Sequence, residues 1–298
     1  MSVLAIDIGG TKFTIALFQA SDGNGPDGSV WQMTRRESRA TDRSGGPGWM
    51  TSQIAEIADA WRKDQPFDRV GVGFGGPVHY PTQKVVLSTH VEGWKDFDLV
   101  QWLRDHFALP VRMDNDANVG ALGEGIFGAG RGLRPLFYMT LSTGIGGGIL
   151  TESGVLRGAD SYGGEIGHMT IRPGGPHCLC GFYGCFERIC AGMGLERDYG
   201  RPASELMCDP EFVKRYVVDL ALGLKAAIMI LNPARIVIGG GIAKAGDALF
   251  IPLREELRRT ITNWSRARID VVPAALVDDS VLWGALVLAL DGTTEELK

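Results

Sequence analysis

Apolar residues occur along the chain in short runs and at helical spacings, and most runs end at glycine or proline. Residues 3–18, VLAIDIGGTKFTIALF, form two apolar runs around a Gly-Gly-Thr-Lys turn, which predicts a β-hairpin. Residues 21–29, rich in Asp, Gly and Pro, read as a surface loop. Apolar residues at helical intervals predict a helix over 51–64. Further short strands are predicted at 69–78 and 111–118, and a second helix at 98–110.

The second half of the chain repeats this style. Residues 136–154 again predict a strand, a glycine-rich turn and a strand, and 211–233 predict a long, mostly buried helix. Residues 235–246 predict a strand, a glycine-rich turn and a helix, and 281–290 a final buried helix. Strands that alternate with helices indicate an α/β fold with mainly parallel sheets.

The hairpins at 3–18 and 136–150 suggest two similar halves whose glycine-rich turns face one cleft. The chain has no low-complexity tract or long linker, so we expect the halves to be joined by a short crossing near 117–120.

Composition argues against a nucleic-acid-binding, secreted or membrane-spanning protein. The 298 residues are 45% hydrophobic and 22% charged, as in an ordinary globular protein, and the net charge of −5 argues against nucleic-acid binding. Asp7 interrupts the apolar N-terminus and no basic segment precedes it, so no signal peptide is expected. The longest apolar run, VLWGALVLAL, is too short to cross a bilayer. We therefore expect a cytoplasmic protein with no membrane or nucleic-acid partner.

The first glycine-rich turn has the composition of a phosphate site. Gly9 and Gly10 allow backbone N–H groups to approach an anion, while Thr11 and Lys12 add a hydroxyl group and a positive charge. Asp7, at the end of a predicted strand, offers the hard oxygen that Mg²⁺ prefers. The alternative is a plain hairpin turn that contains a lysine.

Two more glycine-rich turns follow predicted strands. One contains Thr143 and Gly144, and the other contains Gly240 and Gly241, which leave room for an adenosine to approach the backbone. None of the three turns has the spacing of a P-loop or of a dinucleotide fingerprint. Together they favour a nucleotide-binding cleft.

Three of the five cysteines lie close together and predict a metal site. His168, Cys178, Cys180 and Cys185 have the spacing H-x9-C-x-C-x4-C, which suits a closed tetrahedral Zn²⁺ site. Such a zinc is structural and activates no water, because all four positions are filled. The alternatives are a cluster of unmetallated thiols, or a site in which the neighbouring His177 competes as a ligand.

The motifs AIDIGGTK, GVGFGGPV, DNDAN, STGIGGGI, GGEIGHM, CLCGFYGCFE and VIGGGI occur in this order between residues 5 and 241. In these motifs the chain resembles the ROK family of repressors and sugar kinases. The resemblance implies the actin-like ATPase (ribonuclease H-like) fold, with two α/β domains around a cleft. It places a small domain at 1–117 plus about 281–298, and a large domain with the zinc-binding loop at 118–280.

The resemblance also implies roles for individual residues. Asp116 corresponds to the general base, although an Asx-turn that caps the following helix is the alternative for this residue. The sugar-binding set is Gly76, Asn115, Asp116, Glu165, His168 and Glu187. The nucleotide-binding set is Asp7, Gly9, Gly10, Thr11, Lys12, Thr143, Gly144, Gly240 and Gly241. The implied cofactors are ATP, Mg²⁺ and structural Zn²⁺.

The predicted function is ATP-dependent phosphorylation of a hexose hydroxyl, at position 6 by the family's habit, in a homodimer. The enzyme would be glucokinase-like or a related hexose or N-acetylhexosamine kinase. His90 stands roughly where sugar kinases of this family often carry an asparagine, which leaves the sugar open.

Three alternatives remain. A repressor of this family would carry a helix-turn-helix ahead of the first glycine-rich turn, for which Asp7 leaves no room. A sugar-binding regulatory protein without kinase activity is disfavoured by the presence of Asp7, Thr11, Lys12 and Asp116. Polyphosphate could also replace ATP as the phosphoryl donor.

Overall fold

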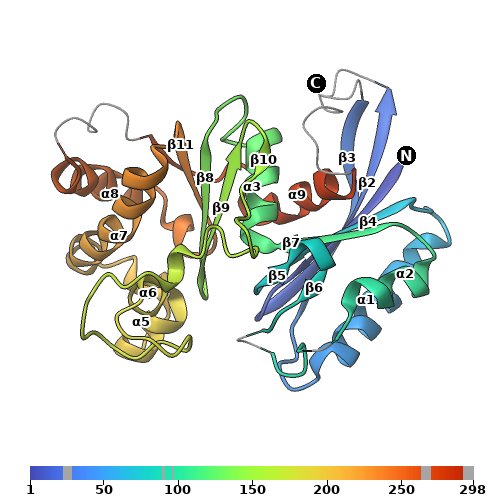
Figure 1. Ribbon diagram of the computed structural model, residues 1–298, viewed down its shortest axis with the longest axis horizontal. Coiled ribbons are helices and arrows are strands. Elements are labelled where there is room, and N and C mark those ends of the chain that lie inside the picture. Colours follow the sequence, from blue (N-terminus) through green and yellow to red (C-terminus); the bar gives the residue numbers. More distant parts are fainter. Residues whose placement is uncertain (23–28, 89–90, 96, 263–269, 291–298) are drawn as a thin grey trace. The chain divides into compact units, whose positions relative to one another are not determined.

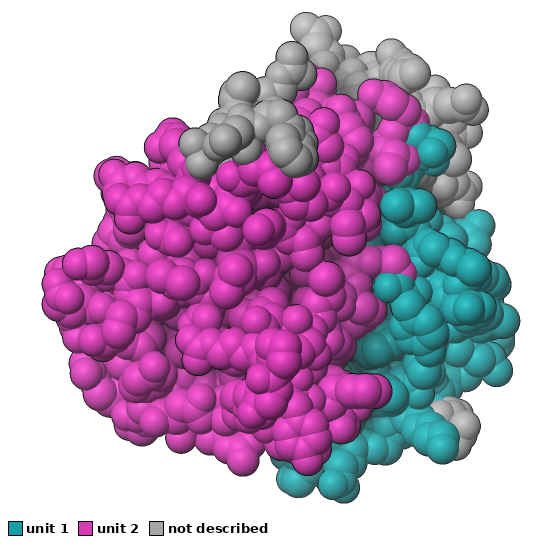
Figure 2. Space-filling model, turned by 60° about the vertical axis from the view of Figure 1, so that its left-hand side comes forward, with its two compact units in different colours: residues 1–123, 153–162, 281–298 teal, residues 124–152, 163–280 magenta. Residues whose placement is uncertain are grey.

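The computed structural model describes residues 1–22, 29–88, 91–95, 97–262 and 270–290. The chain folds into two compact units, coloured separately in Figure 2. Unit 1 comprises residues 1–123, 153–162 and 281–298, and unit 2 comprises residues 124–152 and 163–280.

The passage from unit 1 to unit 2 lies within a helix. Helix α3 (Asp116–Ile126) runs through residues 117–120, where the sequence analysis places a short crossing, and the units divide inside it after Gly123. Residues 153–162 group with unit 1, although the sequence analysis assigns them to the second domain. A long-range grouping of this kind follows from contacts between distant residues, which local patterns do not report.

Unit 1 is built on a five-stranded mixed sheet of order β3-β2-β1-β4-β7. Its strands are β1 (Ser2–Ile8), β2 (Lys12–Asp22), β3 (Ser29–Ala40), β4 (Arg69–Phe74) and β7 (Val111–Asn115). β1 pairs antiparallel with β2 and parallel with β4, and β4 pairs parallel with β7. The carboxyl ends of β1, β4 and β7 therefore lie at the same edge of the sheet.

Helices cover both faces of this sheet. α1 (Gly46–Arg62) and α2 (Leu99–Phe107) pack on one face, and α9 (Ser280–Ala289) on the other (Figure 1). α9 lies very close to its neighbours: a Cβ atom on Gly71 of β4 would lie 1.9 Å from the Ala285 carbonyl oxygen. A Cβ on Gly284 would lie 1.7 Å from that of Val119 in α3. Only glycine fits at these two contacts. The short β5 (Val78–His79), η1 (Tyr80–Thr82) and β6 (Lys84–Val85) also belong to this unit.

The second sheet is also mixed and has the order β10-β9-β8-β11-β12. Its strands are β8 (Leu136–Leu141), β9 (Ile145–Thr151), β10 (Gly154–Val155), β11 (Arg235–Gly239) and β12 (Val271–Pro273). β8 and β9 form the predicted antiparallel hairpin, while β11 pairs parallel with both β8 and β12. The two long helices α7 (Pro210–Leu231) and α8 (Asp247–Thr260) lie side by side in Figure 1 and share the core of unit 2 with the sheet.

Unit 2 also contains shorter helices between its strands and long helices. They are η2 (Ile166–His168), α4 (Phe186–Cys190), α5 (Gly192–Tyr199), α6 (Ala203–Leu206), η3 (Ile242–Ala245) and η5 (Val277–Asp279). Among the residues that the structure describes, no helix has the length and apolar character needed to cross a bilayer.

Two predictions need correction. β3 was not predicted, because its outward side chains are polar and charged, and the strand is stabilised by antiparallel pairing with β2. Both sheets are mixed and not mainly parallel, since each contains an antiparallel hairpin beside its parallel strands.

Candidate functional site

The turn after β1 is fixed by residues that follow β3. The Thr41 side chain and main chain donate to the carbonyl oxygens of Gly9 and Thr11, each at 2.9 Å. Arg43 Nε donates to the Gly10 carbonyl oxygen at 3.0 Å. The side chains of Thr11 and Lys12 are exposed at this turn. Sequence reasoning missed Thr41 and Arg43, since each lies thirty or more residues from its partners.

In unit 2 the two other glycine-rich turns lie against each other. Gly240 has a positive φ of 93°, and a Cβ there would lie 2.5 Å from the Leu141 carbonyl oxygen. The turn after β8 is held by the start of α5: Gly192 N–H donates to the Ser142 carbonyl oxygen at 2.7 Å, and Met193 N–H to that of Thr143 at 3.2 Å. Residues 142–144 and 240–241 therefore form one backbone surface.

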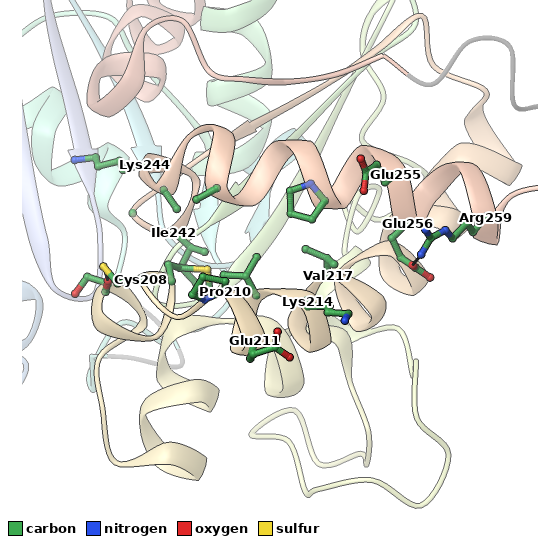
Figure 3. Close-up of a pocket in the computed structure, with 17 residues that line it drawn as sticks. Cys208, Pro210, Glu211, Lys214, Val217, Ile242, Lys244, Glu255, Glu256 and Arg259 are labelled. Carbon is green, nitrogen blue, oxygen red and sulfur yellow. Dashed lines mark hydrogen bonds and ion pairs between the residues drawn. The ribbon is translucent and has the colours of Figure 1, made fainter.

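This surface borders a pocket of about 970 Å³. Figure 3 shows Pro210, Lys214 and Val217 from α7 opposite Glu255 and Glu256 from α8. The remaining labelled side chains in Figure 3 are Cys208, Glu211, Ile242, Lys244 and Arg259. Gly241 lines the same pocket, so the pocket opens where the predicted adenosine contact lies.

The predicted base lies where β4 and β7 end in unit 1. Asn115 caps α3: its Oδ1 atom accepts hydrogen bonds from Ala117 N–H at 3.0 Å and Asn118 N–H at 3.4 Å. Asn115 Nδ2 donates to the Gly76 carbonyl oxygen at 3.1 Å. Asp116 Oδ1 accepts from Ala117 N–H at 2.9 Å, and Asp116 Oδ2 lies 3.7 Å from the position of a Cβ on Gly75. Gly76, Asn115 and Asp116 are thus brought together.

Glu165, His168 and Glu187 are brought together in unit 2. His168 Nε2 lies 3.9 Å from Glu165 Oε2, and Glu187 Oε2 accepts a hydrogen bond from Ile145 N–H at 2.8 Å. Burial raises the pKa of Glu165, the facing imidazole lowers it, and the charge of Glu187 raises it further. Two carboxylates beside an imidazole can accept hydrogen bonds from neighbouring hydroxyl groups of a ligand.

The other face of His168 meets the three thiols. The ligand atoms of His168, Cys178, Cys180 and Cys185 all lie within 4.8 Å of one another. Cys180 Sγ lies 3.6 Å from Cys185 Sγ, and Cys178 Sγ lies 3.9 Å from His168 Nδ1. A tetrahedral zinc with bonds of about 2.0–2.3 Å places its ligand atoms roughly 3.5 Å apart. The donor set and its spacing therefore fit zinc.

The chemistry of the three thiols also favours a zinc site. Burial and hydrogen bonds with Cys180 and Cys178 raise the pKa of Cys185 to about 12. Three adjacent thiolates need a cation between them, which zinc supplies when it is bound. His177 does not belong to the cluster, because its ring packs edge-on against Tyr183 at 5.2 Å.

Backbone contacts close the loop that carries the cysteines. Phe186 N–H donates to the Met169 carbonyl oxygen at 2.9 Å, and Thr170 and Cys185 form an antiparallel bridge. Gly184 has a φ of 66°, and a Cβ there would lie 1.7 Å from the Arg172 carbonyl oxygen, so only glycine fits.

The predicted residues thus fall into two groups. Asp7, Gly9, Gly10, Thr11, Lys12, Gly76, Asn115 and Asp116 belong to unit 1, and Thr143, Gly144, Glu165, His168, the three cysteines, Glu187, Gly240 and Gly241 belong to unit 2. His90 lies outside the described residues.

Comparison with known proteins identifies the class. A ROK hexokinase from Thermus thermophilus, known from its crystal structure, is 31% identical to this chain. The two structures superpose with a TM-score of 0.80 over 97% of this chain and 98% of that one. The ROK family model matches residues 3–292, so the chain belongs to the ROK family, and the predicted actin-like ATPase fold is confirmed.

Other relatives indicate the range of functions in the family. A glucokinase from Thermotoga maritima is 31% identical over 96% of both chains. A ROK family glucokinase from Streptomyces griseus, solved in complex with glucose and AMPPNP, is 24% identical and superposes with a TM-score of 0.83 over 98% of this chain and all of that one. A xylose repressor from Bacillus subtilis is 25% identical over 76% of this chain and 62% of its own length. The family therefore contains both sugar kinases and repressors.

Proposed function

We propose that the protein is an ATP-dependent sugar kinase that transfers the terminal phosphoryl group of ATP to a hexose hydroxyl. The observation that carries the proposal is Asp116, a half-buried carboxylate at the ends of β4 and β7, beside the side chain of Asn115. Phosphoryl transfer to an alcohol needs a carboxylate that accepts the hydroxyl proton. The glucokinases among its relatives support the same assignment.

The sugar would be held by hydrogen bonds to six residues. The candidates in unit 1 are Asn115, Asp116 and the backbone at Gly76, and the candidates in unit 2 are Glu165, His168 and Glu187. His168 is suited to a double role, because its Nδ1 atom faces the thiols while Nε2 is on the side of Glu165. Zinc bound at Nδ1 would fix the ring and leave Nε2 for a sugar hydroxyl.

The nucleotide would bind along the glycine-rich turns. Thr11 and Lys12 would contact its phosphates, together with the backbone at Thr143 and Gly144. The pocket beside Gly241 would receive the adenosine. Asp7 is the carboxylate that we assign to Mg²⁺, which supplies charge neutralisation on the phosphates when it is bound.

The reaction transfers one proton and one phosphoryl group. Asp116 takes the proton of the sugar hydroxyl while the hydroxyl oxygen forms a bond to the γ-phosphorus. The bond from the γ-phosphorus to the bridging oxygen breaks, and ADP leaves with that electron pair. We assign the 6-hydroxyl as the acceptor and a homodimer as the assembly, both from the resemblance to the family.

A coupled ADP-release assay over hexoses and N-acetylhexosamines tests the proposal. ATP and polyphosphate are compared as donors, and Asp116→Asn is the inactive control. Turnover by the native protein that is lost in this variant supports the assignment. Turnover with polyphosphate alone would replace the donor but keep the reaction class.

A sugar-binding regulator without kinase activity is the second candidate, favoured by the xylose repressor among the relatives. Calorimetric binding of a sugar, with no release of ADP over the whole panel, would select it over the kinase.

A further inference from the structure

A buried ion pair joins Arg157 to Asp114, which lies two residues before the candidate base Asp116 in the chain. Asp114, on β7, is 1% exposed, and its Oδ2 atom accepts a hydrogen bond from Arg157 Nε at 2.7 Å. Arg157 belongs to the segment 153–162, which groups with unit 1 although it is distant in sequence. The arginine Cζ atom lies 3.6 Å from the centroid of the Tyr80 ring, a cation–π contact.

The second carboxylate oxygen of Asp114 accepts hydrogen bonds from residues on both sides of Asp116 in the chain. Asp114 Oδ1 accepts from Asn115 N–H at 2.8 Å and from Asn118 Nδ2 at 3.1 Å. One residue precedes Asp116 and the other lies in the first turn of α3. The Asp114 carboxylate therefore joins the end of β7 to the start of the helix, with Asp116 between its two partners.

Further hydrogen bonds fix the arginine side of the pair. Tyr80 N–H donates to Ser161 Oγ at 3.1 Å, which holds the segment that carries Arg157 against η1. Gln83 Nε2 donates to the carbonyl oxygens of Tyr80 at 2.8 Å and Met113 at 3.1 Å, and Gln83 Oε1 accepts from Met113 N–H at 2.7 Å. The ring under the arginine is thereby attached to β7, the strand that carries Asp114.

The pair differs from a surface salt bridge in its surroundings. Burial raises the pKa of Asp114, and the charge and hydrogen bond of Arg157 lower it. Removal of the arginine alone would leave a buried, uncompensated carboxyl group two residues from the base. Removal of both charges would leave a neutral site with the same fold but a looser turn.

We propose that Asp114 and Arg157 are positioning residues for the phosphoryl transfer, and that their ion pair sets the orientation of Asn115 and Asp116. The inference rests on the proposed function. It predicts an effect on the chemical step, because a small displacement of a base from its acceptor proton lowers the rate more than it lowers binding.

The test compares Asp114→Asn, Arg157→Gln, the double variant and Arg157→Lys in the ADP-release assay with ATP and the best hexose. We expect each single neutral variant to lower kcat at least about tenfold, with the KM for ATP unchanged within about twofold. The double variant should lose about as much as one single variant, since both members act through one contact. Arg157→Lys keeps the charge and should recover part of kcat.

Arg235→Gln is a matched control. Arg235 Nε also lies 2.7 Å from an aspartate oxygen, that of Asp270, but on β11 in unit 2 and outside the assigned machinery. Its loss should lower the thermal midpoint without a selective loss of kcat. If a single variant fails to fold, the neutral double variant and Arg157→Lys still give the comparison with the native protein.

Three results would overturn the inference: kcat within twofold of native in the folded variants, additive losses in the double variant, or losses that Arg235→Gln reproduces. A native protein with no turnover on any sugar or donor overturns the proposed function as well. Native turnover with unaffected variants overturns only the role of the ion pair.

Discussion

Glu124 and Ser280 lie 156 residues apart in the chain, yet their side chains share a hydrogen bond of 2.8 Å. The chain first enters unit 2 at Glu124, leaves it for residues 153–162, and passes to unit 1 again directly after Ser280. The Glu124 carboxylate is completely buried and also accepts from the N–H groups of Ala129, Ala275 and Leu276, at 2.8, 3.1 and 2.9 Å. One side chain thus joins the first residues of unit 2 to its last residues.

Glu124→Gln should therefore destabilise the protein. The amide keeps one acceptor oxygen but turns an NH₂ group toward backbone donors, which leaves buried donors without an acceptor. We expect the free energy of unfolding to fall by about 2 kcal/mol or more. Urea unfolding followed by circular dichroism measures the change. Glu92→Gln, at an exposed position, is the control, and an equal effect of both substitutions would argue against the role of Glu124.

Asp116→Asn should lower kcat at least about a hundredfold, because an amide cannot accept the proton of the sugar hydroxyl. The amide oxygen can still accept from Ala117 N–H, so the start of α3 and the binding of sugar and ATP should persist. Steady-state kinetics and calorimetry measure the two effects. Near-native kcat would exclude Asp116 as the base, and loss of sugar binding would point to Glu165 or Glu187. Asp105→Asn, an exposed residue of α2, is the control.

Cys180→Ser should lower the zinc content from one atom per chain and raise the KM for sugar. Structural zinc has an apparent binding energy of roughly 10–16 kcal/mol in finger peptides when all four ligands are present. Because the variant lacks one of the four ligands, we expect a chelator to remove its zinc. Inductively coupled plasma spectrometry measures the metal. Cys208→Ser changes a thiol outside the cluster and should retain zinc. A native protein without zinc would contradict the assignment.

Gly241→Val should raise the KM for ATP at least about tenfold while sugar binding is unchanged. Gly241 has a helical φ of −62°, and a Cβ there meets only Ser142 Oγ, at 3.8 Å, so valine can be accommodated by the backbone. Its side chain would occupy the pocket assigned to adenosine. Gly48→Val, where a Cβ meets nothing within 4 Å, is the control. An unchanged KM for ATP would place the nucleotide elsewhere.

Local patterns predicted much of the fold. The hairpins β1–β2 and β8–β9 follow from apolar runs around glycine, and α7 follows from its long apolar periodicity. The metal cluster was also predictable, since its ligands are close in sequence and their types suit one metal. β3 was missed because pairing with β2 stabilises a strand of largely polar residues.

Contacts between distant residues could not be predicted. Arg157 and Asp114 are 43 residues apart, and nothing in the pattern around either residue indicates the other. Glu124 was not singled out from the sequence, because its carboxylate is bonded by the N–H groups of Ala275 and Leu276, which lie about 150 residues further along the chain.

The closure of the cysteine loop has a practical consequence for engineering. Because Met169 and Phe186 are hydrogen-bonded neighbours, the loop between them leaves and rejoins the core at one point. Within this loop, a turn closed by the hydrogen bond from Gly175 N–H to the Arg172 carbonyl oxygen, at 2.9 Å, lies between the zinc ligands His168 and Cys178. Gly174, with a φ of 72° and open space around it, is a suitable site for inserting a small fluorescent tag. A tag at this site would report whether the loop is ordered, and hence whether the purified protein holds its metal.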